Sequence, residues 1–474
     1  MLPKTAFLKR NKTPLFWVFS CILLYISFAY DLHRTDYIKL LTLFTALFFL
    51  FYKLVNLLKT RLVFLTWLAF IFRTVFILAI PNLSQDFYRF IWDGRMILEG
   101  FNPYLHTVES FISTGKFPVA ESQMLYDGMG KLNAGHFTNY PPINQLCFAI
   151  AALFAGKSIL GSVVVMRLII IAADFGTLVF GKKLLLKLNI PSYHIFWYLL
   201  NPFIIIELTG NLHFEGVMIF FLIWSLYLLH SGKWQFSAVI FALSIATKLV
   251  PLMFLPLVFY WFVKYKNSSA TEVFETKSFK TIGFLKLIGF YSLVGISTLV
   301  LFAPFFSTQF INNYTKTVGL WFQNFEFNAS IYYIAREIGY SFRGYNEIAT
   351  IGKTIPVIVI LFVLGVTFLR KNKTTTQLIT SMLFVLSFYY FTATTVHPWY
   401  ISTLLILSVF TNYKFPLVWS FTIILSYLAY LNTNNSENLW IIALEYLIIY
   451  SVFIWEVLIK ENFSNKHINH LNNN

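Results

Sequence analysis

Residues 84–104 (SQDFYRFIWDGRMILEGFNPY) carry several charged side chains directly after a long apolar segment. If this stretch is helical, Asp86, Arg89 and Asp93 lie on one face, because residues three, four and seven positions apart are neighbours on a helix. Ser84 is the predicted N-cap, and the first turn favours an acid such as Asp86. A carboxylate held there can act as a general base toward a hydroxyl, or help to bind a cation.

The opposite face of this predicted helix is apolar, with Phe87, Ile91 and Met96. Gly100 and Pro103 mark its end. The pattern predicts an amphipathic helix lying at a membrane surface. Two interpretations stay open: a solvated helix whose charges pair internally, or a carboxylate placed at the water–lipid boundary to act on a lipid-linked substrate.

Other polar elements also interrupt apolar segments. The turn 210–216 carries Asn211, His213 and Glu215, which suit a phosphate, a sugar or a metal, although no second spaced pair completes a metal ligand set. Lys248 interrupts the apolar run 235–263, and an ionisable residue in such a place pairs, serves a function or extends to the surface. We expect it to neutralise a lipid phosphate.

The segment 395–400 combines His397 with Trp399 and Tyr400. An interfacial aromatic belt accounts for the two large aromatics, but not for His397, which can donate to a phosphate or a sugar hydroxyl. Four further charges lie within apolar segments, and a structural ion-pair network is the expected role for Arg73, Arg167, Asp174 and Glu207.

The composition indicates the environment of these residues. The chain has 474 residues, of which 58% are hydrophobic and 12% charged, whereas about 25% is usual for soluble domains. The net charge of +16 comes from short basic clusters between apolar segments, as the positive-inside rule requires, so a nucleic-acid partner is not expected. Cys21 and Cys147 lie in apolar runs and are expected to be unpaired.

The expected fold is an all-α integral membrane protein, a polytopic bundle of about 12–14 membrane segments. Residues 142–156 form a short helix, and 235–263 a broken hairpin around Lys248 and Pro251. The expected spans are 14–31, 38–58, 62–80, 159–181, 193–209, 213–230, 281–304, 352–370, 376–395, 398–411, 415–431 and 438–459.

Basic residues in the short loops predict the orientation. The N-terminus is predicted to be cytoplasmic because it carries Lys4, Lys9, Arg10 and Lys12. The loops that contain the later basic clusters, 182–187, 264–266 and 370–373, are predicted to be cytoplasmic for the same reason. Segments 81–140, 210–213, 305–351 and 396–400 then lie on the outer face. The two long ones, 81–140 and 305–351, are predicted to be functional. Residues 1–460 form one transmembrane domain, followed by a polar cytoplasmic tail, 461–474, that is expected to be disordered.

The motif Asp86-x-x-Arg89-Phe90-x-Trp92-Asp93-Gly94-Arg95, followed by Gly100-x-Asn102-Pro103-Tyr104, resembles the first outer loop of polytopic GT-C glycosyltransferases. The similarity is to the polyprenyl-phosphate-mannose-dependent mannosyltransferase-like group, and it covers roughly residues 80–405. It continues in Tyr140-Pro141-Pro142 with Gln145, Asn201-Pro202, Asn211-x-His213-x-Glu215, Lys248-x-x-Pro251 and His397-Pro398-Trp399-Tyr400.

This resemblance implies a polyprenyl-phosphate sugar donor, with mannose as the sugar and Asp86 as the catalytic residue. Members of the group often have two adjacent acids here, whereas this chain has Gln85 before Asp86, which favours a single base and a metal-independent, inverting reaction without a cofactor; a divalent metal is the alternative. The expected substrate-binding residues are Arg89, Asp93, Arg95, His213, Glu215, Lys248, His397, Trp399 and Tyr400.

In this interpretation Lys248 stabilises the departing phosphate, helped by Arg89, Arg95 or His397. The expected partners are the lipid donor, a glycan or glycolipid acceptor and membrane lipids, at the outer face of a bacterial inner membrane. A transporter or flippase of a lipid-linked sugar is the main alternative, although such proteins usually have repeated halves and none is visible here. A polymerase or ligase of lipid-linked glycans is the other.

Overall fold

The computed structural model describes residues 12–263, 277–431 and 436–459. Within these ranges the chain is helical and forms no strand, apart from an isolated bridge between Phe327 and Thr395. The all-α class predicted from the sequence is therefore confirmed. Predictions for the following residues fall outside the described ranges: Lys4, Lys9, Arg10, Lys264, Lys266 and the tail 461–474.

The first half of the chain contains α2 (Lys12–Tyr30), α3 (Tyr37–Leu58), α4 (Leu62–Thr74), α5 (Asp86–Leu98), α6 (Val108–Ile112), α7 (Ser122–Ala134), α8 (Pro142–Ala155), α9 (Ile159–Lys187), η1 (Ser192–Ile195), α10 (Phe196–Leu199), α11 (Pro202–Ile204), η2 (Ile205–Gly210), α12 (Glu215–His230), α13 (Trp234–Ile245), η3 (Val250–Phe254), η4 (Pro256–Val258) and α14 (Phe259–Val263). The second half contains α15 (Lys277–Phe302), η5 (Ala303–Phe305), α16 (Thr308–Gln323), α17 (Ile331–Arg343), α18 (Ile348–Leu369), α19 (Thr375–Thr392), η6 (Pro398–Tyr400), α20 (Ile401–Ser408), α21 (Phe415–Thr422), η7 (Ile423–Leu431), α22 (Leu439–Ile454) and η8 (Trp455–Ile459).

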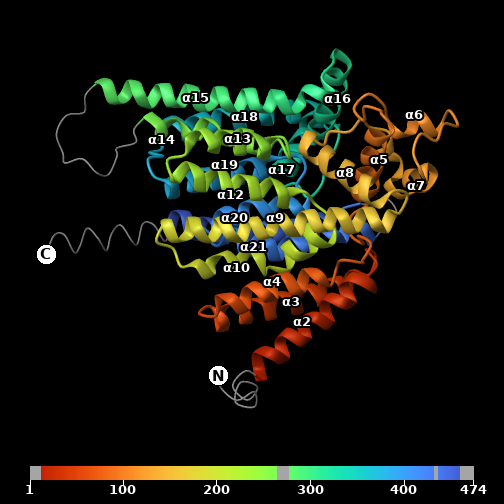
Figure 1. Ribbon diagram of the computed structural model, residues 1–474, viewed down its shortest axis with the longest axis horizontal. Coiled ribbons are helices and arrows are strands. Elements are labelled where there is room, and N and C mark those ends of the chain that lie inside the picture. The colour runs from red at the N-terminus through yellow and green to blue at the C-terminus, as the bar shows by residue number, and fades with distance from the viewer. Residues whose placement is uncertain (1–11, 264–276, 432–435, 460–474) are drawn as a thin grey trace.

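The long helices run side by side as a bundle, and α5, α6, α7 and α16 gather at one end of it (Figure 1). In the described residues, six helices are long and apolar enough to cross a membrane, or seven if the bent pair Pro202–Gly210 and Glu215–His230 counts as one span. Several other predicted spans form helices of only 10–17 residues.

The predicted span 193–209 is not a continuous helix, because Pro202 cannot donate a backbone hydrogen bond. Asn201 caps the new segment by accepting from the N–H of Phe203 at 3.0 Å, and a 114° bend follows before α12. By contrast, the predicted break in 235–263 is confirmed. Lys248 lies between α13 and the first of two 3₁₀ turns, η3, which has Pro251 in its first turn.

Helix α5 forms where the sequence predicts it, but the interpretation as a solvated surface helix, one of the two left open, is wrong. From Phe87 to Met96 every residue except Tyr88 is buried. The reason is close packing against α7 and α8: a Cβ at Gly94 would come within 2.2 Å of the carbonyl oxygen of Phe148. The N-cap is Gln85 rather than Ser84, although the Ser84 hydroxyl accepts from the N–H of Asp86 at 3.3 Å.

The predicted network of four intramembrane charges is correct for one pair. Arg73 Nε and Asp174 Oδ2 lie 2.7 Å apart, with both side chains buried. Arg167 instead donates to backbone carbonyls, including those of Thr209 and Gly210 at 2.8 and 2.9 Å. It thereby fixes the irregular turn that leads into α12. Glu207 accepts a hydrogen bond from the Tyr427 hydroxyl at 2.7 Å.

Candidate active site

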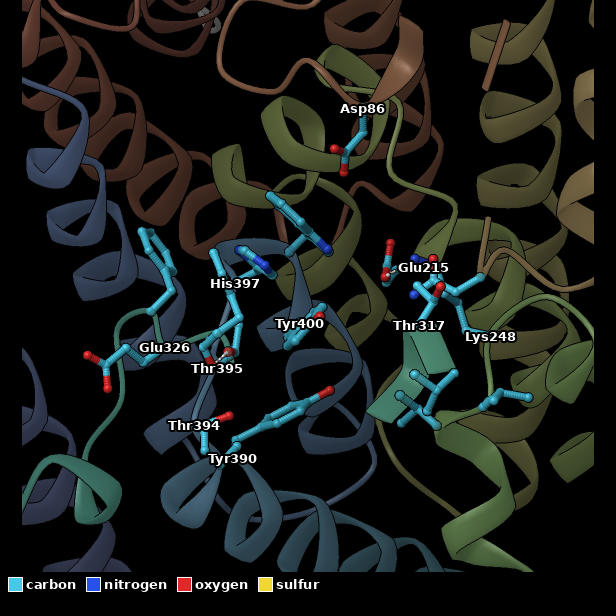
Figure 2. A pocket seen from close by; sticks show the side chains of 18 of the residues that line it. Asp86, Glu215, Lys248, Thr317, Glu326, Tyr390, Thr394, Thr395, His397 and Tyr400 are labelled. Atoms are coloured by element: carbon cyan, nitrogen blue, oxygen red, sulfur yellow. Dashed lines mark hydrogen bonds and ion pairs between the residues drawn. The ribbon is translucent and has the colours of Figure 1, made fainter. Parts of the chain in front are cut away.

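A cavity of about 1300 Å³ lies where the segments predicted to share one face come together. Asp86, Glu215, Lys248 and His397 contribute to its wall, together with residues of α16 to α19 (Figure 2). Helices or turns that are far apart in the sequence supply each of these groups. Their convergence on one cavity agrees with the predicted grouping of 81–140, 305–351 and 396–400, whereas no residue of 210–213 lines it.

Asp86 occupies the first position of α5 and is held from the segment before it. The N–H of Leu83 donates to Asn211 Oδ1 at 3.1 Å, which ties this segment to the turn that carries Glu215. Burial raises the pKa of Asp86 to about 6; the nearby Glu215 also raises it, whereas Lys248, the Tyr140 hydroxyl and Arg34 lower it. The carboxylate is therefore a stronger base than an ordinary aspartate and is still ionised at neutral pH.

Lys248 and Glu215 form an ion pair on the wall of the cavity. Lys248 Nζ lies 3.0 Å from Glu215 Oε1 and 5.2 Å from the centre of the Tyr140 ring. The lysine side chain is 21% exposed and that of Glu215 is 6% exposed, so the ammonium group is the more accessible of the two. Glu215 is the first residue of α12, and the bend before this helix turns it toward the end of α13.

An aromatic stack lies next to these charges. The ring of Trp399 stacks on His397 at 4.6 Å and on His213 at 3.7 Å. Burial and the nearby charge of Lys248 together lower the pKa of His397 to about 3, so this imidazole is neutral at physiological pH. His397 can therefore exchange hydrogen bonds with a ligand but does not supply positive charge.

The cavity also has an extended apolar part. It begins at Leu249 and Val250, next to Lys248, and continues along η3, η4 and α18. Leu252, Ile360 and Leu364 line it and are 43%, 57% and 38% exposed, so the apolar lining is accessible. Helix α18 is one of those long enough to span a membrane, which places this groove beside the hydrocarbon region.

Of the ten residues singled out from the sequence, seven line the cavity. They are Asp86, Arg89, Glu215, Lys248, His397, Trp399 and Tyr400. The remaining three, Asp93, Arg95 and His213, lie behind the wall among other side chains.

The buried groups behind the wall have protein partners. Asp93 pairs with Arg89 at 2.8 Å and accepts from Gln145 at 3.0 Å. Arg95 donates to the carbonyls of Ala120 and Lys157 at 2.6 and 2.8 Å. Arg89 reaches the cavity, yet its Nε pairs with Asp93 and its Nη1 donates to the carbonyls of residues 133 and 136.

A comparison with known families identifies the N-terminal part of the chain. The family model described as alpha-(1->6)-mannopyranosyltransferase, N-terminal domain, matches residues 33–264, a range that contains Asp86, Glu215 and Lys248. These residues, just under half of the chain, are similar to this mannosyltransferase family. No curated protein and no solved structure matches the chain. The expectation of a GT-C-type membrane glycosyltransferase that transfers mannose is confirmed at this level, which favours an enzyme over a transporter.

The mannosyltransferase cavity includes residues that sequence reasoning missed. Arg34 comes from the short loop between α2 and α3, and Thr317, Glu326 and Arg336 come from residues 305–351. A signal for Arg34 existed: by the predicted orientation it lies in the first outer loop, where the positive-inside rule disfavours a basic residue. For the others the length of the segment was informative, but no spacing singled out a residue.

The segment 324–330 of the mannosyltransferase positions the His397 loop. Phe327 exchanges backbone hydrogen bonds with Thr394 and Val396 at 3.1 and 2.8 Å. The next residue, Asn328, anchors this bridge. Its side-chain amide donates to Glu445 at 3.3 Å, and its backbone carbonyl accepts from the Tyr446 hydroxyl at 2.7 Å. Helix α22 thus helps to hold one side of the cavity in place.

In the described part of the mannosyltransferase, no group of three or more His, Cys, Asp or Glu side chains is arranged to hold a metal ion. The residue before Asp86 is Gln85, and its amide donates to the carbonyl of Met129 at 3.0 Å. This contact turns the Gln85 side chain toward α7. The prediction of a metal-independent reaction stays a prediction.

Proposed function

We propose that this mannosyltransferase takes mannose from a donor in which the sugar is joined through phosphate to a polyprenyl lipid. The acceptor is a hydroxyl group of a glycan or glycolipid. The observation that carries this proposal is the continuity between the Asp86–Lys248 region and the apolar groove along α18. A lipid-linked donor can fill both parts, whereas a nucleotide sugar has no apolar chain to cover the groove.

In the proposed reaction Asp86 accepts the proton of the acceptor hydroxyl. The oxygen of that hydroxyl attacks the anomeric carbon of mannose at the same time. The bond from this carbon to the phosphate oxygen breaks, and the phosphate leaves with the electron pair as an anion. This leaving group needs no proton, but it needs positive charge, which Lys248 supplies. Direct displacement inverts the anomeric centre. A base with a pKa of about 6 suits proton transfer near neutral pH.

Glu215 and the aromatic stack have supporting roles in this proposal. Glu215 holds the Lys248 ammonium at the cavity wall through their 3.0 Å contact. Trp399 and Tyr400 are half-buried and line the cavity, so a sugar can pack against the exposed parts of their side chains. His213 keeps Trp399 in position by stacking on it. Arg89, Asp93 and Arg95 shape α5 and thereby the position of Asp86.

We place the reaction on the extracytoplasmic face of a bacterial inner membrane, following the distribution of basic loop residues. The support is that segments predicted to be extracytoplasmic, 81–140, 305–351 and 396–400, all contribute to the same cavity. Cysteine labelling tests this orientation. Cysteines introduced at Ser113 and Lys373, both exposed, should react from opposite sides of sealed vesicles, and labelling of both from one side would contradict it.

The donor assignment is tested with purified protein in lipid vesicles and radiolabelled polyprenyl-phosphate mannose. We expect release of polyprenyl phosphate together with a mannosylated acceptor. Ile360→Asp, which charges the groove, should raise the KM for a long-chain donor more than that for a short-chain analogue. Ile358→Asp is the matched control, because Ile358 is exposed on the same helix but does not line the cavity. An equal effect of both substitutions would contradict a lipid-binding groove.

A further inference from the structure

Arg34 is a basic residue of the cavity to which the sequence assigned no role. It lies in the loop between α2 and α3, and its guanidinium carbon is 4.1 Å from the centre of the Tyr430 ring. Contact with an aromatic face holds the guanidinium in place without neutralising its charge. The charge acts on the site, since it is one of those that lower the pKa of Asp86.

Most basic side chains in the cavity wall already have an acidic partner. Among the five lysine and arginine residues that line it, Lys248 pairs with Glu215, Arg89 with Asp93 and Arg336 with Glu326. Within the described ranges, Arg34 and Lys131 form no ion pair with a carboxylate. Lys131 is exposed on α7, whereas Arg34 is partly buried against Tyr430.

Arg34 and Lys248 approach the site from different sides. Helices α2 and α3, which flank Arg34, form one edge of the bundle, and α13, which precedes Lys248, lies toward the opposite edge (Figure 1). Both charges lower the pKa of Asp86. Arg34 and Lys248 therefore reach the cavity from separate parts of the bundle.

A guanidinium group has five N–H donors and no acceptor, and its planar fork matches two oxygens of a phosphate. A charged group without a partner is costly beside apolar walls unless a ligand supplies the counter-charge. We propose that Arg34 binds a phosphate group of a substrate, at a subsite separate from Lys248. This inference rests on the proposed function, because a phosphate-bearing substrate must enter the same cavity.

The phosphate can come from the donor or from the acceptor, and kinetics distinguish the two. Arg34→Gln removes the charge, Arg34→Lys keeps a charge without the planar fork, and both are assayed with polyprenyl-phosphate mannose. The acceptors are an alkyl mannoside and the same mannoside carrying a phosphate. Arg370→Gln is the matched control, because Arg370 also lies over an aromatic ring, that of Phe384 at 4.8 Å, but does not line the cavity.

We expect Arg34→Gln to raise the KM of one phosphate-bearing substrate about ten- to hundredfold, the usual effect of losing a charged hydrogen bond, with Arg34→Lys in between. If the donor is the source, the KM for polyprenyl-phosphate mannose rises and inhibition by polyprenyl phosphate weakens. If the acceptor is the source, only the KM for the phosphorylated mannoside rises. The enzyme then no longer prefers the phosphorylated mannoside over the plain one.

Unchanged KM values for both substrates in Arg34→Gln, with wild-type turnover intact, would overturn the role of Arg34. Equal losses in Arg34→Gln and Arg370→Gln would also overturn it, because they would indicate a general effect of removing a stacked arginine. Absence of turnover by the wild-type protein with any polyprenyl-phosphate mannose would instead contradict the proposed function. The two failures are thus distinguishable.

Discussion

Lys248 Nζ lies 3.0 Å from Glu215 Oε1, so the lysine that faces the cavity is already paired with a carboxylate before any substrate binds. This ion pair joins the end of α13 to the first turn of α12. The pair keeps the positive charge of Lys248 next to the apolar groove, and Glu215 partly neutralises that charge. The pair therefore influences how strongly the site attracts a phosphate.

Lys248→Ala should weaken donor binding and lower kcat by about a hundredfold, since it removes a group that stabilises the departing phosphate. The loss should exceed that of the charge alone, because Glu215 then remains as an uncompensated anion near the phosphate. Adding Glu215→Gln to Lys248→Ala should restore part of the donor affinity. A double-mutant cycle on KM and kcat measures this coupling, and strictly additive effects would contradict it.

Asp86→Asn should reduce kcat at least a hundredfold, because the amide cannot accept the proton of the acceptor hydroxyl. The comparison is Asp127→Asn, an exposed aspartate in the same loop region, which should keep wild-type activity. Release of polyprenyl phosphate measures both. Full activity of Asp86→Asn would refute the assignment of this base.

Asp86→Asn should not destabilise the protein at neutral pH. The pKa of Asp86 is raised to about 6 in the folded protein, above its unfolded value, so the folded state binds more protons between the two values. Stability contributed by this group is present at low pH and decreases as pH rises through about 6. The neutral asparagine lacks this cost, and the Tm of Asp86→Asn at pH 7 should equal or exceed that of the wild type.

The pH profile follows from the same group. Only ionised Asp86 is a base, so kcat/KM should fall as pH decreases below about 6, approaching a tenfold loss for each further pH unit. The rate should level off above this pH. A profile recorded between pH 4.5 and 8 tests this, and an acid limb centred near pH 4, as for an ordinary aspartate, would indicate a different environment for the carboxylate.

Asp93→Asn should reveal whether the second aspartate of α5 is structural. Asp93 and Arg89 form a buried ion pair, and loss of one partner leaves a buried charge, which costs about 3–5 kcal/mol. We expect a lower Tm with a similar pH profile in the protein that remains folded. A normal Tm with lost activity would instead assign Asp93 to the reaction.

Activity should persist when divalent cations are removed with EDTA. Gln85 stands where a second acid would adjoin Asp86, so the α5 terminus offers a single carboxylate. Turnover is measured before and after chelation, and again after Mg²⁺ or Mn²⁺ is added back. A loss that either ion reverses would show that the reaction uses a metal.

The sequence predicted much of the fold and part of the site. Hydropathy and loop charges gave the helical membrane architecture and the break at Lys248, because both depend on local composition. Helical spacing and the N-cap pattern placed Asp86 at the start of a helix, within two residues of where it begins. These features are determined by residues close together in the chain.

Tertiary structure decided the rest. No spacing could show that α7 and α8 enclose α5, that Lys248 pairs with Glu215, or that Arg34 reaches the same cavity. Each of these contacts joins segments separated by tens or hundreds of residues, so their distance depends on how the helices pack. The sequence determined which groups are available for chemistry, and packing determined which of them carry an unpaired charge into the cavity.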